Sequence, residues 1–169
     1  MKKICFYLLG NLTLLSISST AYSQELSAQE LMNLLKCDRT CFSNAIEKKG
    51  FKYSGGGYEQ YHPTMIYTGE KKYQTGTCTP RPNSISLTRV GIFDVLNLET
   101  YYGTYDLDLY KEFGEKFHYM YVSDEKDPDD GSKITIYRSD KYPEIELEVF
   151  TKQDANYCVK TNYKLIKRH

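Results

Sequence analysis

The sequence predicts an α+β fold in which short N-terminal helices pack on an antiparallel sheet, arranged as two tandem helix-plus-sheet units. Three observations support this prediction. A capped amphipathic segment lies near the start of the chain, several segments alternate apolar and polar residues as strands do, and a similar order of elements occurs twice. The 169 residues are enough for one domain or two small ones.

The N-terminus has the pattern of a secretory signal peptide over residues 1–23. Two lysines precede an apolar run from Ile4 to Ile17, and the last three residues, Ala-Tyr-Ser, place small residues where a signal peptidase reads them. The apolar run is too short and too polar for a comfortable membrane span. We expect cleavage before Gln24 and a single α+β domain over 24–169. The mature protein would lie in a bacterial periplasm or outside the cell, with no membrane insertion.

The charge balance argues against a nucleic-acid-binding protein, which would normally be basic. The chain has 22 basic and 22 acidic side chains, and without the signal peptide it has 20 and 22, a net charge of −2. The balance is uneven along the chain, because an acidic segment between Asp106 and Asp130 contrasts with a basic tail that ends in Lys167 and Arg168.

Four cysteines remain after export, because Cys5 leaves with the signal peptide. An even number in a small exported protein predicts two structural disulfides among Cys37, Cys41, Cys78 and Cys158. Three pairings are possible. We favour Cys37 with Cys41, which needs a break in the helix near Asp38, and Cys78 with Cys158. Neither a metal nor another cofactor is expected, because a zinc site needs more ligands at closer spacing.

Local signals predict three helices. Residues 26–36 are expected to form a short helix with Ser27 as its cap and Glu30 three positions later, the pattern of a capping box. Asp38 is expected to start a second helix, which stops at a Lys-Lys-Gly sequence. A third helix is expected over 106–115, again starting at an aspartate.

Strands are expected where apolar residues alternate with polar ones or form short runs. The clearest is Glu-Ile-Glu-Leu-Glu-Val at 144–149, a half-buried antiparallel strand. The full set of expected strands covers residues 51–53, 64–68, 73–79, 85–90, 92–101, 117–122, 134–139, 144–151 and 157–166.

An internal repeat is a further hypothesis, with units at 24–103 and 104–169. An offset of 68 residues aligns Asp38 with Asp106, Glu47 with Glu115, Lys48 with Lys116, and Tyr53 with Tyr121. The later strands align only after changes in loop length.

Tandem units of short helices followed by antiparallel strands resemble the plan of β-lactamase-inhibitor-like proteins. The resemblance covers most of the mature chain, rests on the order of elements and matches no family motif. It implies an exported protein that binds an enzyme through a concave sheet. The cysteines depart from a repeated plan, because three of the four lie in the first unit, and no binding residue is carried over.

The acidic segment is the sharpest local feature, with nine acids and three lysines between Asp106 and Asp130. A calcium loop is excluded, because Arg138 stands where the closing glutamate belongs. The segment is either a solvated hairpin turn or an acidic finger that enters a partner's basic cleft. In the second case Asp127, Asp129 and Asp130 are binding residues.

Tyr58 and Tyr61 are the second candidates for binding, because they follow a flexible Ser-Gly-Gly-Gly run where burial is harder to arrange. Tyrosine supplies stiff contact area with a polar tip at interfaces. Packing within strands is the simpler explanation for such residues. Sugar binding could use them too, although the chain has no tryptophan.

No catalytic constellation is found, so we expect no enzyme. Glu144, Glu146 and Glu148 share one strand face and could in principle hydrolyse a glycan. The alternate positions are apolar, so this face is more simply the solvent side of a strand. The histidines are scattered, with His118 expected inside a strand, and no serine lies in a nucleophile elbow.

These observations favour an exported, non-enzymatic protein-binding module, similar to an inhibitor or an immunity protein, that occludes a secreted toxin or enzyme. The alternative is a cell-envelope structural protein or one that binds a small ligand or glycan, for which a tyrosine-lined pocket would be the sign.

Overall fold

The structure is a computed structural model of the whole chain. It describes residues 25–56, 58–59, 62–73, 78–101, 103–128, 130–153 and 159–169, and for 58–59, 62–63, 103–107 and 153 it describes the backbone alone. The predicted signal peptide, Tyr61, Asp129 and Cys158 lie outside the described residues.

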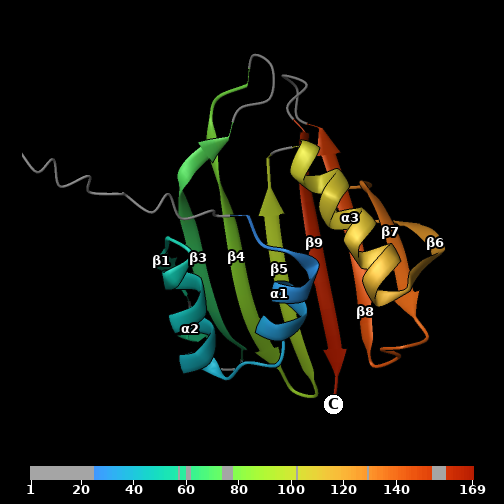
Figure 1. Ribbon diagram of the computed structural model, residues 1–169, viewed down its shortest axis with the longest axis horizontal. Helices are drawn as coiled ribbons and strands as arrows, with labels where there is room; N and C mark the ends of the chain where they lie inside the picture. Colours follow the sequence, from blue (N-terminus) through green and yellow to red (C-terminus); the bar gives the residue numbers. More distant parts are fainter. Residues whose placement is uncertain are drawn as a thin grey trace, which may run out of the picture.

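One antiparallel sheet dominates the molecule (Figure 1). Its strands are adjacent in the order β1-β3-β4-β5-β9-β8-β7-β6, and the short β2 pairs with β3 outside this order. The described elements, in chain order, are α1 (Ala28–Leu34), α2 (Arg39–Lys48), β1 (Phe51–Gly55), β2 (Tyr58–Glu59), β3 (His62–Tyr73), β4 (Arg81–Val90), β5 (Phe93–Thr100), α3 (Gly103–Phe117), β6 (Tyr119–Lys126), β7 (Lys133–Ser139), β8 (Ile145–Gln153) and β9 (Val159–Arg168).

The predicted fold class is wrong. In place of an α+β protein with N-terminal helices packed on the sheets of two tandem units, the structure is mostly an eight-stranded antiparallel sheet, with 55% strand and 22% helix. The physical reason is the pairing of β5 with β9, which runs from Phe93 opposite Arg168 to Thr100 opposite Thr161. This pairing joins the earlier and later strands into one continuous sheet.

The first two helices begin where their caps predict. The Ser27 side chain accepts a hydrogen bond from the Glu30 N–H, and the Glu30 carboxylate accepts one from the Ser27 N–H, which completes the capping box. Asp38 caps α2 by accepting from the Cys41 N–H at 2.8 Å. Gly50 follows α2 with φ of 83°, a conformation that glycine adopts without steric cost.

The Cys37–Cys41 disulfide is confirmed, with 5.2 Å between the two Cα atoms. It forms because the chain leaves helical geometry between α1 and α2, so that Cys37 lies in the connection and Cys41 in the first turn of α2. Cys78 is also disulfide-bonded. The predicted pairing of Cys78 with Cys158 lies outside the described residues.

Some predicted boundaries are wrong. Helix α3 begins at Gly103, so Asp106 lies inside the helix instead of capping it. Strand β3 continues to Tyr73, whereas Cys78 and Thr79, placed in a strand by the sequence, are not in one. His118 lies between α3 and β6 instead of inside a strand, with a positive φ of 56°.

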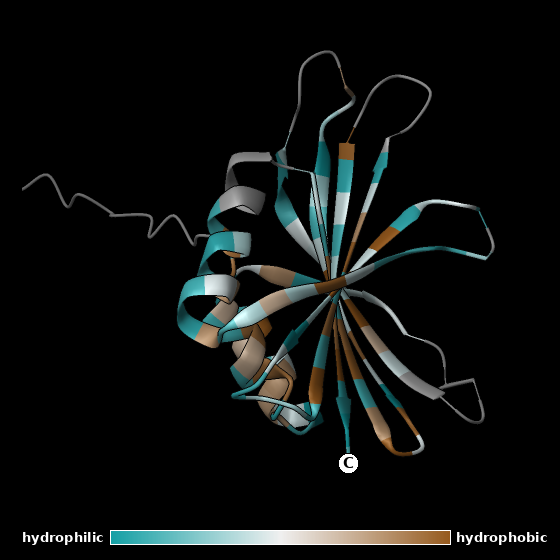
Figure 2. Cartoon of the chain, turned by 90° about the vertical axis from the view of Figure 1, so that its right-hand side faces the viewer, coloured by the Kyte–Doolittle hydropathy of each residue, from teal (hydrophilic) through white to brown (hydrophobic). Residues whose placement is uncertain are grey.

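The described helices all lie on the same side of the sheet (Figure 2). Strand side chains on that side form the core with them, in rows that cross the sheet. One such row runs Leu87, Leu96, Leu165 and Leu147, each about 1% exposed. Burying these apolar side chains provides the main driving force for folding. The other side of the sheet carries no described helix, and this side holds the candidate site.

Candidate functional site

The side of the sheet away from the helices is called here the uncovered face. Side chains alternate between the two sides of a strand, so the neighbours of the core residues point to this face. The strand register places its members in three rows, which comprise Thr64, Thr88, Val95, Ile166, Glu146 and Arg138; Ile66, Ser86, Asn97, Lys164, Glu148 and Ile136; and Thr68, Ser84, Glu99, Asn162, Phe150 and Ile134.

The half of this face on β3, β4 and β5 consists mainly of small polar side chains. Thr64 and Thr88 are cross-strand neighbours, and their hydroxyl oxygens lie 2.9 Å apart in a hydrogen bond. Ser86 and Asn97 are likewise neighbours at its centre. Short side chains leave the backbone of these strands close to any molecule that lies on them.

The half on β9, β8 and β7 carries ion pairs instead. Lys164 Nζ lies 2.7 Å from Glu148 Oε2, and both Nε and Nη2 of Arg138 lie 2.7 Å from Glu146 Oε2. Lys160 links this half to β5 by binding Glu99 at 2.8 Å. Each pair joins adjacent strands, so the charges on this half are matched across the strands.

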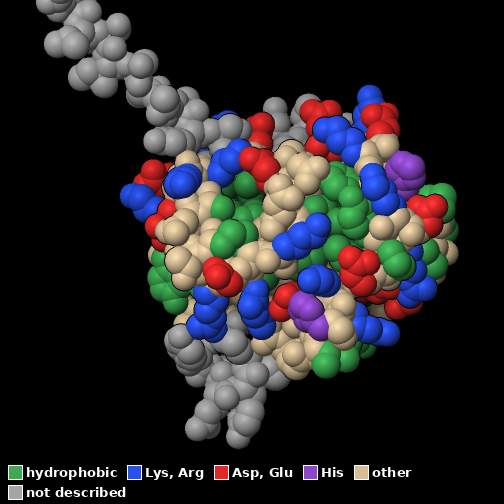
Figure 3. Space-filling model, turned by 60° about the horizontal axis from the view of Figure 1, so that its bottom comes forward, with side chains coloured by type: hydrophobic (Ala, Val, Ile, Leu, Met, Phe, Trp, Pro, Cys, Tyr) green, Lys and Arg blue, Asp and Glu red, His purple; other side chains and the backbone are tan. Residues whose placement is uncertain are grey.

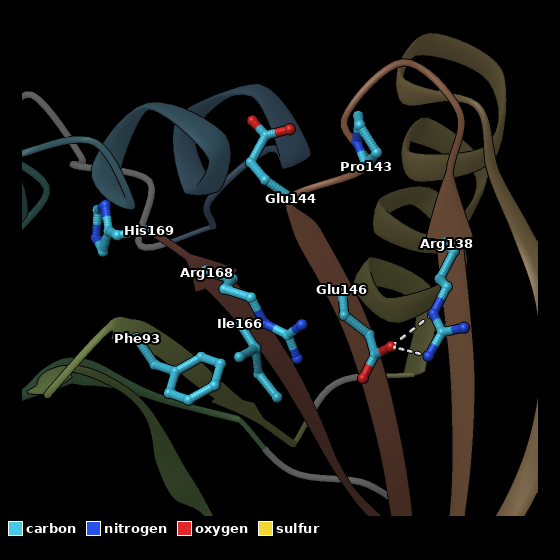
Figure 4. Close-up of a pocket in the computed structure, with 8 residues that line it drawn as sticks. All are labelled: Phe93, Arg138, Pro143, Glu144, Glu146, Ile166, Arg168 and His169. Atoms are coloured by element: carbon cyan, nitrogen blue, oxygen red, sulfur yellow. Dashed lines mark hydrogen bonds and ion pairs between the residues drawn. The ribbon is translucent and has the colours of Figure 1, made fainter.

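A pocket of about 580 Å³ lies at the end of the uncovered face where β5 begins and β9 ends (Figure 4). It is lined by Phe93, Arg138, Pro143, Glu144, Glu146, Ile166, Arg168 and His169. Apolar walls and a few convergent charged groups are the usual composition of a binding pocket.

Arg168 is the most distinctive group in this pocket. Its guanidinium lies over the ring of Phe93, its cross-strand neighbour, with 5.5 Å between the guanidinium carbon and the ring centroid. Its backbone N–H donates to the Glu144 carbonyl at 2.9 Å, which fixes the end of β9 against the start of β8. In the described part of the chain, no carboxylate lies within ion-pair distance of this guanidinium.

Two other ionisable groups of the pocket, those of His169 and Glu144, turn away from Arg168. His169 binds Asp94 through Nε2 at 2.8 Å, and Figure 4 shows its ring turned away from Arg168. The Glu144 carboxylate also points away from Arg168 in that view. Burial raises the pKa of the Tyr119 hydroxyl above its ordinary value, and the negative charge of Glu144 raises it further.

The predicted acidic residues lie in the hairpin between β6 and β7. Asp130 forms an ion pair with Lys152 of β8 and accepts from the Ser132 N–H, and these bonds hold the pKa of its carboxyl well below the usual range. The Asp127 backbone closes the turn through Ser132 and Gly131. The hairpin is therefore tied to β8, and part of its negative charge is neutralised.

The other predicted site residues are only partly described. Tyr58 lies in β2, where the structure gives its backbone but not its side chain, while Tyr61 and Asp129 lie outside the described residues. Glu146 and Glu148 lie on the uncovered face, and Glu144 joins Glu146 in lining the pocket. The sequence prediction missed Phe93 and Arg168, although the basic C-terminal tail was a signal for the second.

Surface charge on the drawn side of the molecule is mixed. In Figure 3 the described basic and acidic side chains lie interspersed, without a large area of one sign. No group of three or more His, Cys, Asp or Glu residues that could hold a metal ion occurs among the described residues. Within the same part of the chain, no helix has the length and apolar character needed to cross a membrane.

Comparison with known proteins gives no relative. The chain matches no protein-family model, no curated protein and no solved structure. No comparison therefore supports the resemblance to β-lactamase-inhibitor-like proteins that the order of elements in the sequence suggested.

Proposed function

We propose that this protein is an exported, non-enzymatic module that binds a protein partner across the uncovered face and acts by occluding it. The observation that carries the proposal is the one-sided cover of the sheet, because the described helices leave the opposite side of eight adjacent strands without a layer. The signal-peptide pattern supports a periplasmic or secreted location.

The size of the face fits one protein partner. Eight strands about 4.8 Å apart span about 34 Å, and eight-residue strands rise about 26 Å, which gives a face of about 900 Å². Each side of a standard protein complex contributes about 800 Å². A surface of this size is larger than a small ligand or a short glycan needs.

The composition of the face also fits a separable partner. Threonine, serine, asparagine and paired charges outnumber its apolar residues. A permanent subunit interface is more apolar, whereas a partner that also exists free leaves a polar surface exposed to water. Apolar contact is still available from Val95, Ile166 and Phe150.

The test places one arginine at the centre of the face. The wild-type protein and the Asn97→Arg and Gln29→Arg variants are immobilised, and proteins of the secreted and cell-envelope fractions are applied. Gln29 is the matched control, because it is exposed on α1, on the helix side, and gains the same charge. A protein held by wild type is then purified and its affinity for each variant measured by calorimetry.

We expect the Gln29→Arg variant to bind this partner as wild type does, and Asn97→Arg to weaken binding by about a hundredfold or more, because a long charged side chain would be forced into the contact. Equal affinity for both variants would show that the uncovered face is not the interface. Retention of only a second copy of this chain, or of a glycan alone, would also overturn the proposal.

A further inference from the structure

We propose that the pocket at the end of β9 is an anchor site for a carboxylate group of the bound polypeptide, with Arg168 as the residue that recognises it. This inference rests on the proposed function, since it names the chemistry of the partner at one end of the uncovered face. The pocket has a volume of about 580 Å³, enough for a whole acidic side chain.

The first argument is the charge inventory of the pocket. Arg138 is neutralised by Glu146, and His169 is engaged by Asp94. Among the described residues, no carboxylate forms an ion pair with the guanidinium of Arg168, which lies over the Phe93 ring. An anion that enters the pocket would therefore meet a guanidinium that no internal carboxylate already occupies.

The second argument is preorganisation. Contact with the Phe93 ring, whose centroid lies 5.5 Å from the guanidinium carbon, restrains the Arg168 side chain, and the hydrogen bond from the Arg168 N–H to the Glu144 carbonyl holds its backbone. A guanidinium that lies over an aromatic ring can still offer two parallel N–H hydrogen bonds to one planar oxyanion. Little side-chain freedom is left to lose on binding, which favours affinity.

The third argument selects the anion. Glu144 lines the same pocket, and its charge repels a doubly charged phosphate more strongly than a singly charged carboxylate. Phe93, Ile166 and Pro143 supply apolar walls for the methylene groups that carry a carboxylate in a polypeptide. Two groups of a polypeptide supply such a carboxylate: an aspartate or glutamate side chain, and the carboxylate at the C-terminus of a chain.

The experiment follows the side-chain Nε–H signal of Arg168 by NMR in the full-length mature protein. The probes are an end-capped pentapeptide with one central glutamate, its glutamine counterpart, an acetylated tetrapeptide with a free C-terminal carboxylate, its amide, and a capped phosphoserine peptide. The glutamate and free-carboxylate arms distinguish the two sources of the group.

We expect at least one of these two peptides to shift the Arg168 signal saturably, with a dissociation constant of about 1 mM, and its neutral counterpart to leave the signal unchanged. Arg168→Gln should weaken binding about tenfold or more, measured by calorimetry or by backbone shifts. Lys167→Gln, which removes the same charge on the opposite side of β9, should weaken it less than about twofold.

Arg168→Lys keeps the charge but loses the planar pair of donors, and should bind as weakly as Arg168→Gln. It also serves if the glutamine variant unfolds. The anchor site is excluded if no peptide shifts the Arg168 signal at a concentration about 10-fold above the expected dissociation constant. It is also excluded if Lys167→Gln weakens peptide binding as much as Arg168→Gln does, or if the phosphoserine peptide binds more tightly than the carboxylate peptides. If Asn97→Arg abolishes partner binding while Arg168→Gln leaves it unchanged, the proposed function stands and the anchor alone fails.

Discussion

The two halves of the sheet share a framework but carry different surfaces. In the first half Tyr67 of β3 packs edge-on against Phe42 and Tyr53, with ring centroids 5.8 Å and 5.4 Å away. In the second half Tyr137 of β7 packs in the same way against Tyr110 and Tyr121, at 5.3 Å and 6.3 Å. Tyr53 and Tyr121 are 68 residues apart, as are Phe42 and Tyr110.

The backbone matches at these positions as well. Both edge strands have an irregularity just after the exposed tyrosine, between Tyr53 and Gly55 in β1 and between Tyr121 and Ser123 in β6. Bulges on edge strands discourage pairing with another chain. On the uncovered face, by contrast, one half has hydroxyl groups and the other has ion pairs, so equivalent frameworks can present different chemistry. That residues 24–103 and 104–169 are repeat units stays a prediction.

The largest expected difference between the halves lies in the aromatic clusters. Phe42 is fully buried, whereas Tyr110 at the matching position is 46% exposed. We expect Phe42→Ala to lower the free energy of unfolding by about 3–5 kcal/mol, because it leaves a cavity in the core. Tyr110→Ala should cost about 1 kcal/mol. Urea unfolding of both variants measures this, and equal losses would show that the halves are packed alike.

The turns between helix and strand give a second comparison. Gly50 and His118, also 68 residues apart, both have positive φ, 83° and 56°. Gly50→Ala should lower the free energy of unfolding by about 1 kcal/mol, because a Cβ is disfavoured in this conformation. His118→Gly should raise the free energy of unfolding by about 0.5 kcal/mol. Glycine relieves the strain of the positive φ, but its greater freedom in the unfolded chain offsets part of that gain. Thermal and urea unfolding test the opposite signs, and a loss on His118→Gly would contradict the argument.

The same comparisons show what sequence can and cannot predict. The caps at Ser27 and Asp38 and the Cys37–Cys41 disulfide follow from residues a few positions apart, so local rules found them. The pairing of β5 with β9 joins residues more than 60 positions apart and has no local signal. Without it, neither the single sheet nor the contact of Arg168 with Phe93 could be foreseen.

A pH effect is expected on the helix side of the first half. Burial would raise the pKa of Glu30, but hydrogen bonds from Lys49 and Ser27 outweigh it and lower the pKa below its ordinary 4.5. Folding therefore gains stability from this carboxylate above about pH 4.5 and loses it as the pH falls through the lower, folded-state value.

Unfolding of wild type and Glu30→Gln between pH 7 and pH 2 checks this. Wild type should be the more stable at pH 7, and the two free energies should converge as the pH falls below about 4.5. Lys49→Gln should remove part of the same pH dependence, because its ammonium lies 2.5 Å from the Glu30 carboxylate. A difference that grows toward low pH would show that the sign is wrong.

The smallest effects concern the uncovered face, where two cross-strand pairs allow a direct comparison of its halves. Thr64 and Thr88 are linked by hydroxyl groups, and Glu148 and Lys164 by charge. A double-mutant cycle with Thr→Val variants and another with Glu148→Gln and Lys164→Gln should each give a coupling energy of about 0.5 kcal/mol. The Glu148 side chain is 15% exposed and that of Lys164 33%, so solvent reaches the pair.

The response of these coupling energies to salt distinguishes the two halves. Raising the ionic strength to about 1 M shortens the screening length to about 3 Å, so the Glu148–Lys164 coupling should fall by about half or more, while the Thr64–Thr88 coupling should change little. If both couplings keep their values in salt, the second half is held by geometry and not by charge. Ion pairs that salt does not weaken would also stay closed when a partner approaches. Binding across the face would then have to rely on the half lined by hydroxyl groups.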